Sequence, residues 1–292
     1  MVFMQLFVNS LIIGSIYALV AAGFSLIYTT NKFLHIAHGV SIALGGYLLF
    51  LFFNLLGLPF AGACIIAIVL TSLIGLAMYQ FVYLPLQKKK ASTIILLIAS
   101  LAILILVQNL IQLFFGANVK SIDYLKVREG ISVFGAIITP LQIIIVLIAL
   151  TLFVLLYLFM KKTTLGKNMR AVSDNKELAS IIGIDYKKVA GASFLLGSML
   201  AAVAGILIGM EQNIEPVMGT QLIIKGFTAS IIGGIGSVAG VIPGAYILGF
   251  AENFGIWYLP SGYKDAIAFG LLFLFLLFRP QGLFGLKKGV KQ

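Results

Sequence analysis

The sequence predicts an all-α protein that crosses a membrane about eight or nine times. The chain of 292 residues is 61% hydrophobic and only 10% charged, whereas soluble domains carry about 25% charged residues. Its mean hydropathy is +1.12. The apolar runs are continuous and about 20 residues long, which suits spanning helices and is about twice the length of a barrel strand. We therefore expect residues 1–292 to form one transmembrane domain.

Seven apolar runs are each suited to one span, and the first lacks the basic start and cleavage site of a removable signal peptide. The remaining run, 221–252, would be roughly 46 Å long as one helix, too long for a bilayer core of about 30 Å. Because Gly233–Gly244 holds five glycines and a proline, we expect two segments, 221–234 and 238–252, that meet at a bend. The seven runs cover 3–28, 37–56, 60–84, 92–115, 139–160, 189–210 and 264–278.

The basic residues orient these spans, since Lys and Arg concentrate on the cytoplasmic side. With the N-terminus outside and nine crossings, fifteen of the twenty Lys and Arg residues lie inside, four lie outside, and Lys225 is the remaining one. If 221–252 crossed only once, the tail with Lys287, Lys288 and Lys291 would lie outside. The charge distribution therefore favours the broken element.

The spans carry few groups suited to ion coupling or catalysis. Ion-coupled carriers usually need ionisable residues within their spans, and of nine acidic residues only Glu252 is expected at depth. The sequence has no Walker-type GxxxxGK[ST] motif for ATP and no nucleophile–base pair for an intramembrane enzyme. The single cysteine, Cys64, allows no cysteine metal cluster. We therefore expect no catalytic residue, metal or cofactor, and no nucleic-acid partner. A secondary carrier or channel that acts alone stays open as an alternative.

One internal loop, 161–188, holds an island of charge that the orientation assigns to the inside. Asp174 and Glu177 have the spacing of a capping box and Gly183 is a natural stop, so we predict a short helix over 175–182. A helix this short needs a surface to bury its apolar face. Either the inner membrane interface or a groove on a cytosolic partner provides one. The apolar face comprises Leu178, Ile181 and Ile182.

The glycine-rich break has two interpretations. Small residues four apart let helix backbones approach closely in lipid. A helix interruption also exposes backbone groups at the cavity of a transporter. The candidate residues for the break or for a translocation path are Gly233, Gly234, Gly236, Gly240, Pro243, Gly244 and Glu252.

Four stretches of the chain carry a family resemblance. They read GSIYALVAAGFSLIYTTNKFLHIAHGVSIALGGY, TTLGKNMRAVSDNKELASIIGIDYKKVAGASFLLGSMLAAVAGIL, GFTASIIGGIGSVAGVIPGAYILGFAEN and LLFRPQGLFG. Together they run from about residue 10 to 286, and they resemble the permeases of branched-chain amino acid ABC importers. The chain looks most like the shorter, LivH-type subunit.

This resemblance implies an ABC importer permease fold in a bacterial or archaeal inner membrane. It implies a permease that moves branched-chain amino acids or similar small polar solutes into the cytoplasm, within the membrane lipid. The implied partners are a second homologous permease subunit, two cytosolic ATP-binding cassette ATPases and an extracytoplasmic solute-binding protein.

The resemblance also implies that the charged loop docks on the ATPase. By position, the loop matches the family's pattern at Gly166, Arg170, Ala171, Asn175, Ala179 and Gly183. The predicted short helix adds Glu177, Leu178, Ile181 and Ile182 to these docking candidates.

The histidine element FLHIAHG departs from the family, which more often has asparagine–phenylalanine near Leu34–His35. His38 and Gly39 match the family better. A turn of purely structural value is the alternative to a functional role for His38 and Gly39, and the resemblance assigns no role to His35.

Overall fold

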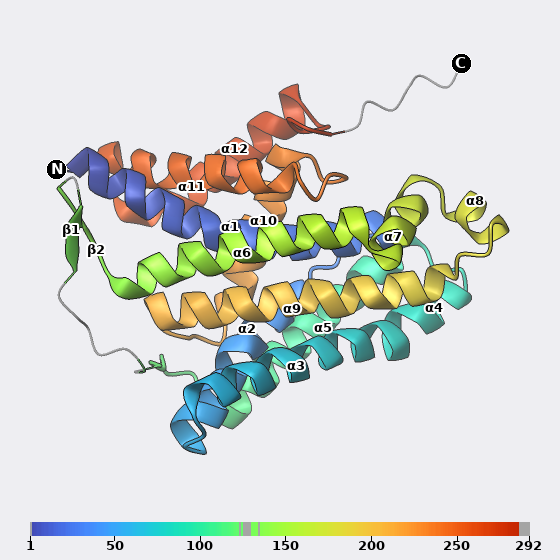
Figure 1. Cartoon of the computed structure of the whole chain (residues 1–292), viewed down its shortest axis with the longest axis horizontal. Coiled ribbons are helices and arrows are strands. Elements are labelled where there is room, and N and C mark those ends of the chain that lie inside the picture. Colours follow the sequence, from blue (N-terminus) through green and yellow to red (C-terminus); the bar gives the residue numbers. More distant parts are fainter. Residues whose placement is uncertain (1, 123, 125–129, 134, 286–292) are drawn as a thin grey trace. The chain divides into compact units, whose positions relative to one another are not determined.

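The computed structural model describes residues 2–122, 124, 130–133 and 135–285, in which helices joined by loops are accompanied by one short β-hairpin and an isolated bridge between Lys120 and Ile214. Five of the Lys and Arg residues that orient the spans lie outside the described residues: Lys126, Arg128, Lys287, Lys288 and Lys291. The helices are α1 (Val2–Asn31), α2 (His38–Leu49), α3 (Phe60–Met78), α4 (Leu84–Lys88), α5 (Thr93–Phe115), α6 (Pro140–Lys162), α7 (Thr164–Asp174), α8 (Lys176–Ile181), α9 (Tyr186–Gln212), α10 (Met218–Gly233), α11 (Val241–Tyr258) and α12 (Lys264–Phe278) (Figure 1).

Three shorter kinds of element complete the chain. Two π-helical turns, Phe50–Leu55 and Tyr79–Tyr83, prolong α2 and α3, and a 3-10 turn, Ser261–Tyr263, precedes α12. The antiparallel hairpin pairs β1 (Ile131–Val133) with β2 (Ala136–Ile138). The sequence did not predict this hairpin.

Seven helices of the described part are long and apolar enough to cross a membrane, and each lies on a run that the sequence predicted. The α12 helix has the predicted bounds. The expected glycine-broken element is confirmed, because α10 ends at Gly233 and α11 begins only at Val241. Gly234 lies between them with φ +111°, a conformation that glycine adopts at little cost.

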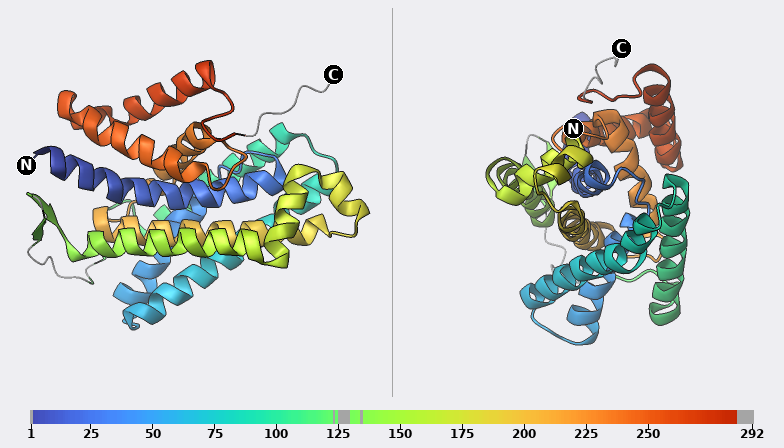
Figure 2. Two further views of the ribbon diagram at one scale, coloured as in Figure 1. Left: turned by 45° about the horizontal axis from the view of Figure 1, so that its top comes forward. Right: turned by 90° about the vertical axis from the view of Figure 1, so that its right-hand side faces the viewer.

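The chain forms two compact units, and α1, α6 and α10 contribute residues to both. Unit 1 consists of residues 1–25, 125–152 and 224–292, and unit 2 of residues 26–124 and 153–223. Within unit 1, α11 and α12 lie side by side (Figure 2). Within unit 2, α2, α3 and α9 pack on one another.

Small residues allow the close helix packing of unit 2. A Cβ atom on Gly205 of α9 would overlap the carbonyl oxygen of Ile42 in α2. The Ser41 hydroxyl donates to that of Ser198 at 3.1 Å between the same two helices. Such contacts stabilise helix pairs in lipid, where burial of apolar surface adds little.

Candidate functional site

The charged loop 161–188 folds into two short helices, of which the sequence predicted only the second. The Thr163 side chain caps α7 by accepting a hydrogen bond from the Gly166 backbone N–H at 3.0 Å. Gly166 is buried, and a Cβ atom there would meet the backbone of Phe159 and Met160. The buried side chains of Met169 and Val172 complete the inner face of α7.

The α8 helix begins one residue later than the capping-box interpretation predicted. Asn175, not Asp174, is the N-cap, and its Oδ1 atom accepts hydrogen bonds from the backbone N–H groups of Glu177 and Leu178 at 2.9 and 3.0 Å. Asp174 instead ends α7. Both residue types cap helices well, so the choice depends on where α7 ends. Gly183 follows α8 with φ +87°, as its predicted role of a stop requires.

The apolar face of α8 points away from the protein. The exposed fractions of Leu178, Ile181 and Ile182 are 60%, 79% and 73%, whereas Ala179 is only 2% exposed and packs inward. An exposed apolar cluster on a charged loop typically marks an interaction site. Of the other docking candidates, Gly166 is buried, Ala171 is half-buried, and Arg170, Asn175, Glu177 and Gly183 are exposed.

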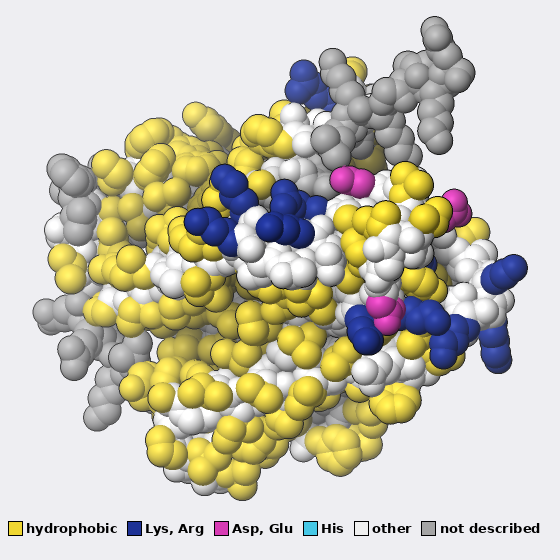
Figure 3. All heavy atoms as spheres, turned by 45° about the vertical axis from the view of Figure 1, so that its right-hand side comes forward, with side chains coloured by type: hydrophobic (Ala, Val, Ile, Leu, Met, Phe, Trp, Pro, Cys, Tyr) yellow, Lys and Arg dark blue, Asp and Glu magenta, His cyan; other side chains and the backbone are white. Residues whose placement is uncertain are grey.

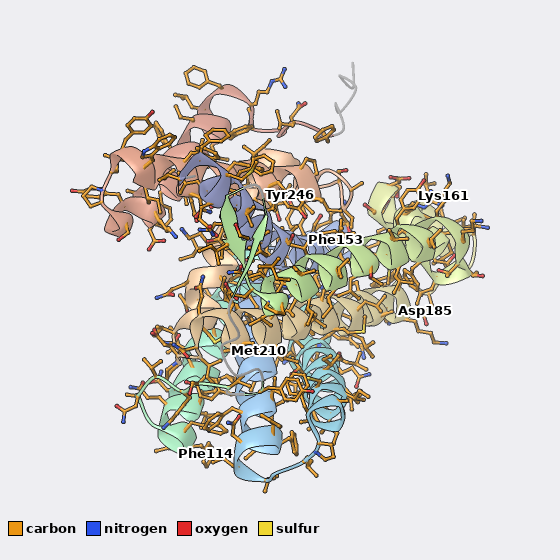
Figure 4. The ribbon with its side chains drawn as sticks, turned by 60° about the vertical axis from the view of Figure 1, so that its left-hand side comes forward. Phe114, Phe153, Lys161, Asp185, Met210 and Tyr246 are labelled. Carbon is orange, nitrogen blue, oxygen red and sulfur yellow. The ribbon has the colours of Figure 1, made fainter. Side chains whose placement is uncertain are left out.

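The loop that carries this face also holds charged groups. Figure 4 shows Lys161 and Asp185 at the same end of α6 and α9. The Lys176 ammonium lies 3.9 Å from the centre of the Tyr186 ring, a cation–π contact that joins α8 to α9. Partial burial lowers the pKa of Lys176, and the nearby charge of Lys187 lowers it further. On the face drawn in Figure 3, charged side chains form a few clusters within a broad hydrophobic surface.

Unit 1 holds an ion-pair centre around the buried Glu252, which we define as Lys225, Glu252, Asp265 and Tyr17. The Lys225 Nζ atom lies 2.5 Å from Glu252 Oε1 and 2.7 Å from Asp265 Oδ1. The Tyr17 hydroxyl donates to the other Glu252 oxygen at 2.8 Å. Lys225 and Glu252 are buried, with side chains 8% and 1% exposed. The centre therefore joins four helices, α1, α10, α11 and α12, through polar side chains.

The sequence pointed to Glu252 but not to its partners. Lys225 is the one basic residue that the orientation assigned to neither side of the membrane. An ionisable residue inside an apolar helix is rare and usually paired, so Lys225 was the available signal. Its pairing with Glu252 and Asp265, 27 and 40 residues away, depends on tertiary structure.

The glycines of the break bring α10 and α11 close together. Cβ atoms on Gly233 or Gly244 would overlap backbone atoms of the opposite helix or of the bend, whereas one on Gly236 would meet nothing within 4 Å. Ser237 Oγ accepts a hydrogen bond from the Gly240 N–H at 3.0 Å. Glu252 lies eight residues beyond Gly244, which is about 12 Å along the helix. The predicted candidates therefore divide into a packed bend and a separate ion-pair centre.

The histidine element is buried in unit 2. His35 Nδ1 and the Tyr83 hydroxyl are 3.0 Å apart, and the Phe194 ring lies 4.7 Å from the imidazole, centre to centre. Burial lowers the pKa of His35, and the neighbouring His38 contributes to the shift. A Cβ atom on Gly39 would come within 2.6 Å of the Gly219 carbonyl oxygen. The His35 contacts pack the turn between α1 and α2, and the Gly39 contact packs α2 against α10.

Comparison with known proteins identifies the family. The model of the family described as "Branched-chain amino acid transport system / permease component" matches residues 6–276. The chain belongs to this permease family. Its curated relatives include the high-affinity branched-chain amino acid transport permease BraD of Pseudomonas aeruginosa, which is 34% identical over 97% of this chain and 96% of its own. LivH of Escherichia coli is 32% identical over the same shares.

The relatives also include an archaeal permease. The probable permease LivH of Methanocaldococcus jannaschii is 30% identical over 95% of this chain and 91% of its own. PsaBC from Streptococcus pneumoniae, solved in complex with Fab, has a chain that shares the fold with a TM-score of 0.53 and 16% identity, over 94% of this chain and 91% of its own. This permease is accordingly a multi-pass protein of a bacterial or archaeal inner membrane.

Proposed function

We propose that this permease forms one half of the membrane pathway of an ATP-binding cassette importer that carries branched-chain amino acids, or similar small solutes, into the cytoplasm. Its relatives named as branched-chain amino acid permeases align along nearly their whole length, which supports this substrate class. Two separate cytosolic ATPases supply the energy. A second homologous permease completes the pathway, and an extracytoplasmic binding protein delivers the solute.

The observation that carries the proposal is the exposed apolar face of α8. Leu178, Ile181 and Ile182 project from a helix that is fixed by the Asn175 cap and by the Lys176–Tyr186 contact. A hydrophobic helix face that enters a groove is a recurring mode of protein recognition. We infer that this face enters a groove of the ATPase and transmits its movement to the permease.

The charged residues near this face fit the same role. Arg170 is exposed on α7, where it adds a basic group to the same loop. Gly166 and Ala179 act indirectly, because their burial fixes the course of the loop. We therefore assign docking contacts to the exposed candidates and loop shape to the buried ones.

A second candidate function has one observation in its favour. Glu252 and Lys225 are buried ionisable groups within the helices of unit 1, and ion-coupled carriers use such groups. In that case the chain would transport without an ATPase.

Substitution of Ile181 by serine tests the docking role, since the side chain is 79% exposed and the fold needs little from it. In membranes that contain the whole importer, we expect Ile181→Ser to lower the solute imported per ATP hydrolysed at least tenfold, with an unchanged amount of permease. Lys188→Ser, whose side chain is 86% exposed, serves as the matched control with normal coupling. Normal uptake by Ile181→Ser and by a Leu178→Ser/Ile181→Ser double variant would reject the proposal.

A further inference from the structure

The α12 helix is attached to α10 at both of its ends. At its start, Asp265 contacts the Lys225 ammonium at 2.7 Å. Beyond its end, the backbone N–H groups of Leu283 and Phe284 donate to the carbonyl oxygens of Ile232 and Gly233 at 2.9 and 3.0 Å. Between these attachments α12 buries only Ala268 among its side chains. The two attachments therefore largely determine where α12 lies against α10.

The attachment after α12 is rigid. Its two backbone hydrogen bonds use the last carbonyl groups of α10, which have no partners within the helix. Gly234 and Gly282 both have positive φ angles, +111° and +73°. A Cβ atom on Gly282 would come within 2.6 Å of Gly234 Cα. Movement here would break two hydrogen bonds and a close backbone contact at once.

The attachment at the start of α12 to α10 is a single ion pair whose acidic partner is exposed at the surface of the protein. The Asp265 side chain is 70% exposed, so its carboxylate can regain water when it leaves Lys225. An exposed carboxylate gives up less hydration in such a pair than a buried one, so its release needs less compensation than the release of Glu252 would. This attachment is therefore the easier of the two to break.

Lys225 keeps its charge compensated when Asp265 leaves. Glu252 Oε1 lies 2.5 Å from the ammonium, and the second Glu252 oxygen accepts the hydrogen bond from Tyr17. Removal of the sole partner of a buried charge is strongly unfavourable. Because Glu252 remains, the contact with Asp265 can open without creating an unpaired buried charge.

The connection before α12 permits a tilt. Leu259 and Pro260 are extended, and one 3-10 turn, Ser261–Tyr263, leads into the helix. A few residues at the end of an element commonly absorb the backbone changes of a hinge movement. The α12 helix can therefore turn about its rigid attachment while its start moves away from α10 and α11.

We propose that the Lys225–Asp265 ion pair is a releasable latch on the start of α12, and that the latch opens during each transport cycle. The Lys225–Glu252–Tyr17 contacts stay intact in both states. The charge distribution of the sequence assigns this end of α12 to the outside. The latch therefore acts at the side of the membrane from which the solute arrives. Only the transport part of this inference rests on the proposed function.

A labelling experiment tests the latch without any transport. Gly255 of α11 is half-buried, and a Cβ atom there would press on the flexible end of Ile267 in α12, so a cysteine at this position is partly shielded by α12 while the latch is closed. With Cys64→Ala as the background, we expect Asp265→Asn to raise the rate at which Gly255→Cys reacts with a fluorescent maleimide at least fivefold. Asp265→Glu, which retains the ion pair, should stay near the parent rate. Equal labelling rates for the Asp265→Asn variant and its parent would overturn the latch.

A disulfide lock tests whether the latch serves transport. A Cβ atom on Gly255 would lie 3.4 and 3.8 Å from the two Cγ atoms of Ile267, which brings the positions within reach of a disulfide bond. We expect the oxidised Gly255→Cys/Ile267→Cys permease to lose at least nine-tenths of its ATP-driven uptake and a reductant to restore it. Normal uptake by the oxidised form would overturn the role of the latch in transport. Absence of uptake in the unsubstituted importer as well would instead reject the proposed function and leave the labelling result intact.

Discussion

Replacement of Lys225 by methionine would leave Glu252 as a buried carboxylate without its cation. At 2.5 Å and an effective dielectric constant of about 20, the Coulomb attraction of the pair is ~7 kcal/mol. Removal of the ammonium also removes its own desolvation penalty of several kcal/mol, so we expect a net loss of about 3–5 kcal/mol. At roughly 2–4 °C per kcal/mol, the unfolding midpoint should fall by about 10 °C.

The double variant Lys225→Met/Glu252→Gln separates the effect of an unpaired buried charge from the effect of altered packing. The amide oxygen of the introduced glutamine would still accept the Tyr17 hydrogen bond, and no buried charge would remain. Replacement of a whole buried pair by neutral groups is often close to neutral. We therefore expect the free energy of unfolding of the double variant to lie within about 2 kcal/mol of the parent's value. It should be higher than that of the single variant.

The assay is thermal unfolding of the purified permease in detergent, followed by the fluorescence of the single Trp257 and by size-exclusion chromatography. If the single and double variants lost equal stability, the loss would come from packing and not from the orphaned charge. A single variant as stable as the parent would also refute the reasoning.

Two further predictions concern unit 2. Gly205→Ala should destabilise the protein by about 1–3 kcal/mol, because its Cβ atom would overlap the Ile42 backbone. Gly62→Ala, where the added atom meets nothing within 4 Å, should be neutral or stabilising, and equal unfolding midpoints for both variants would contradict this. Because burial lowers the pKa of His35, the unfolded chain takes up more protons than the folded one below pH ~6.5. Stability should therefore be greatest above that pH and fall as the pH drops below it. His35→Gln should flatten this dependence in thermal unfolding, and an unchanged slope would contradict it.

Periodicity and helix-breaking residues located the long helices. The apolar run 264–278 became α12 without change, because Pro260 and Gly262 precede it and Pro280 follows it. The glycines of 233–244 likewise located the break, since they disfavour a continuous helix.

The sequence was less informative where tertiary contacts decide the structure. The α7 helix is short, and its burial of Met169 depends on how the loop packs. Asp174 and Asn175 are both good caps, so the start of α8 could not be chosen from the sequence. The partners of Glu252 come from α1 and α10, and Lys225 also pairs with Asp265 of α12; no local pattern joins these residues.

Reconstitution of the purified permease into vesicles tests the central claim most directly. We predict branched-chain amino acid uptake only when the second permease, the two ATPases, the binding protein and ATP are all present. We predict no flux down a solute, proton or sodium gradient through this chain alone. Gradient-driven amino acid flux without an ATPase would contradict the account and favour a self-sufficient carrier.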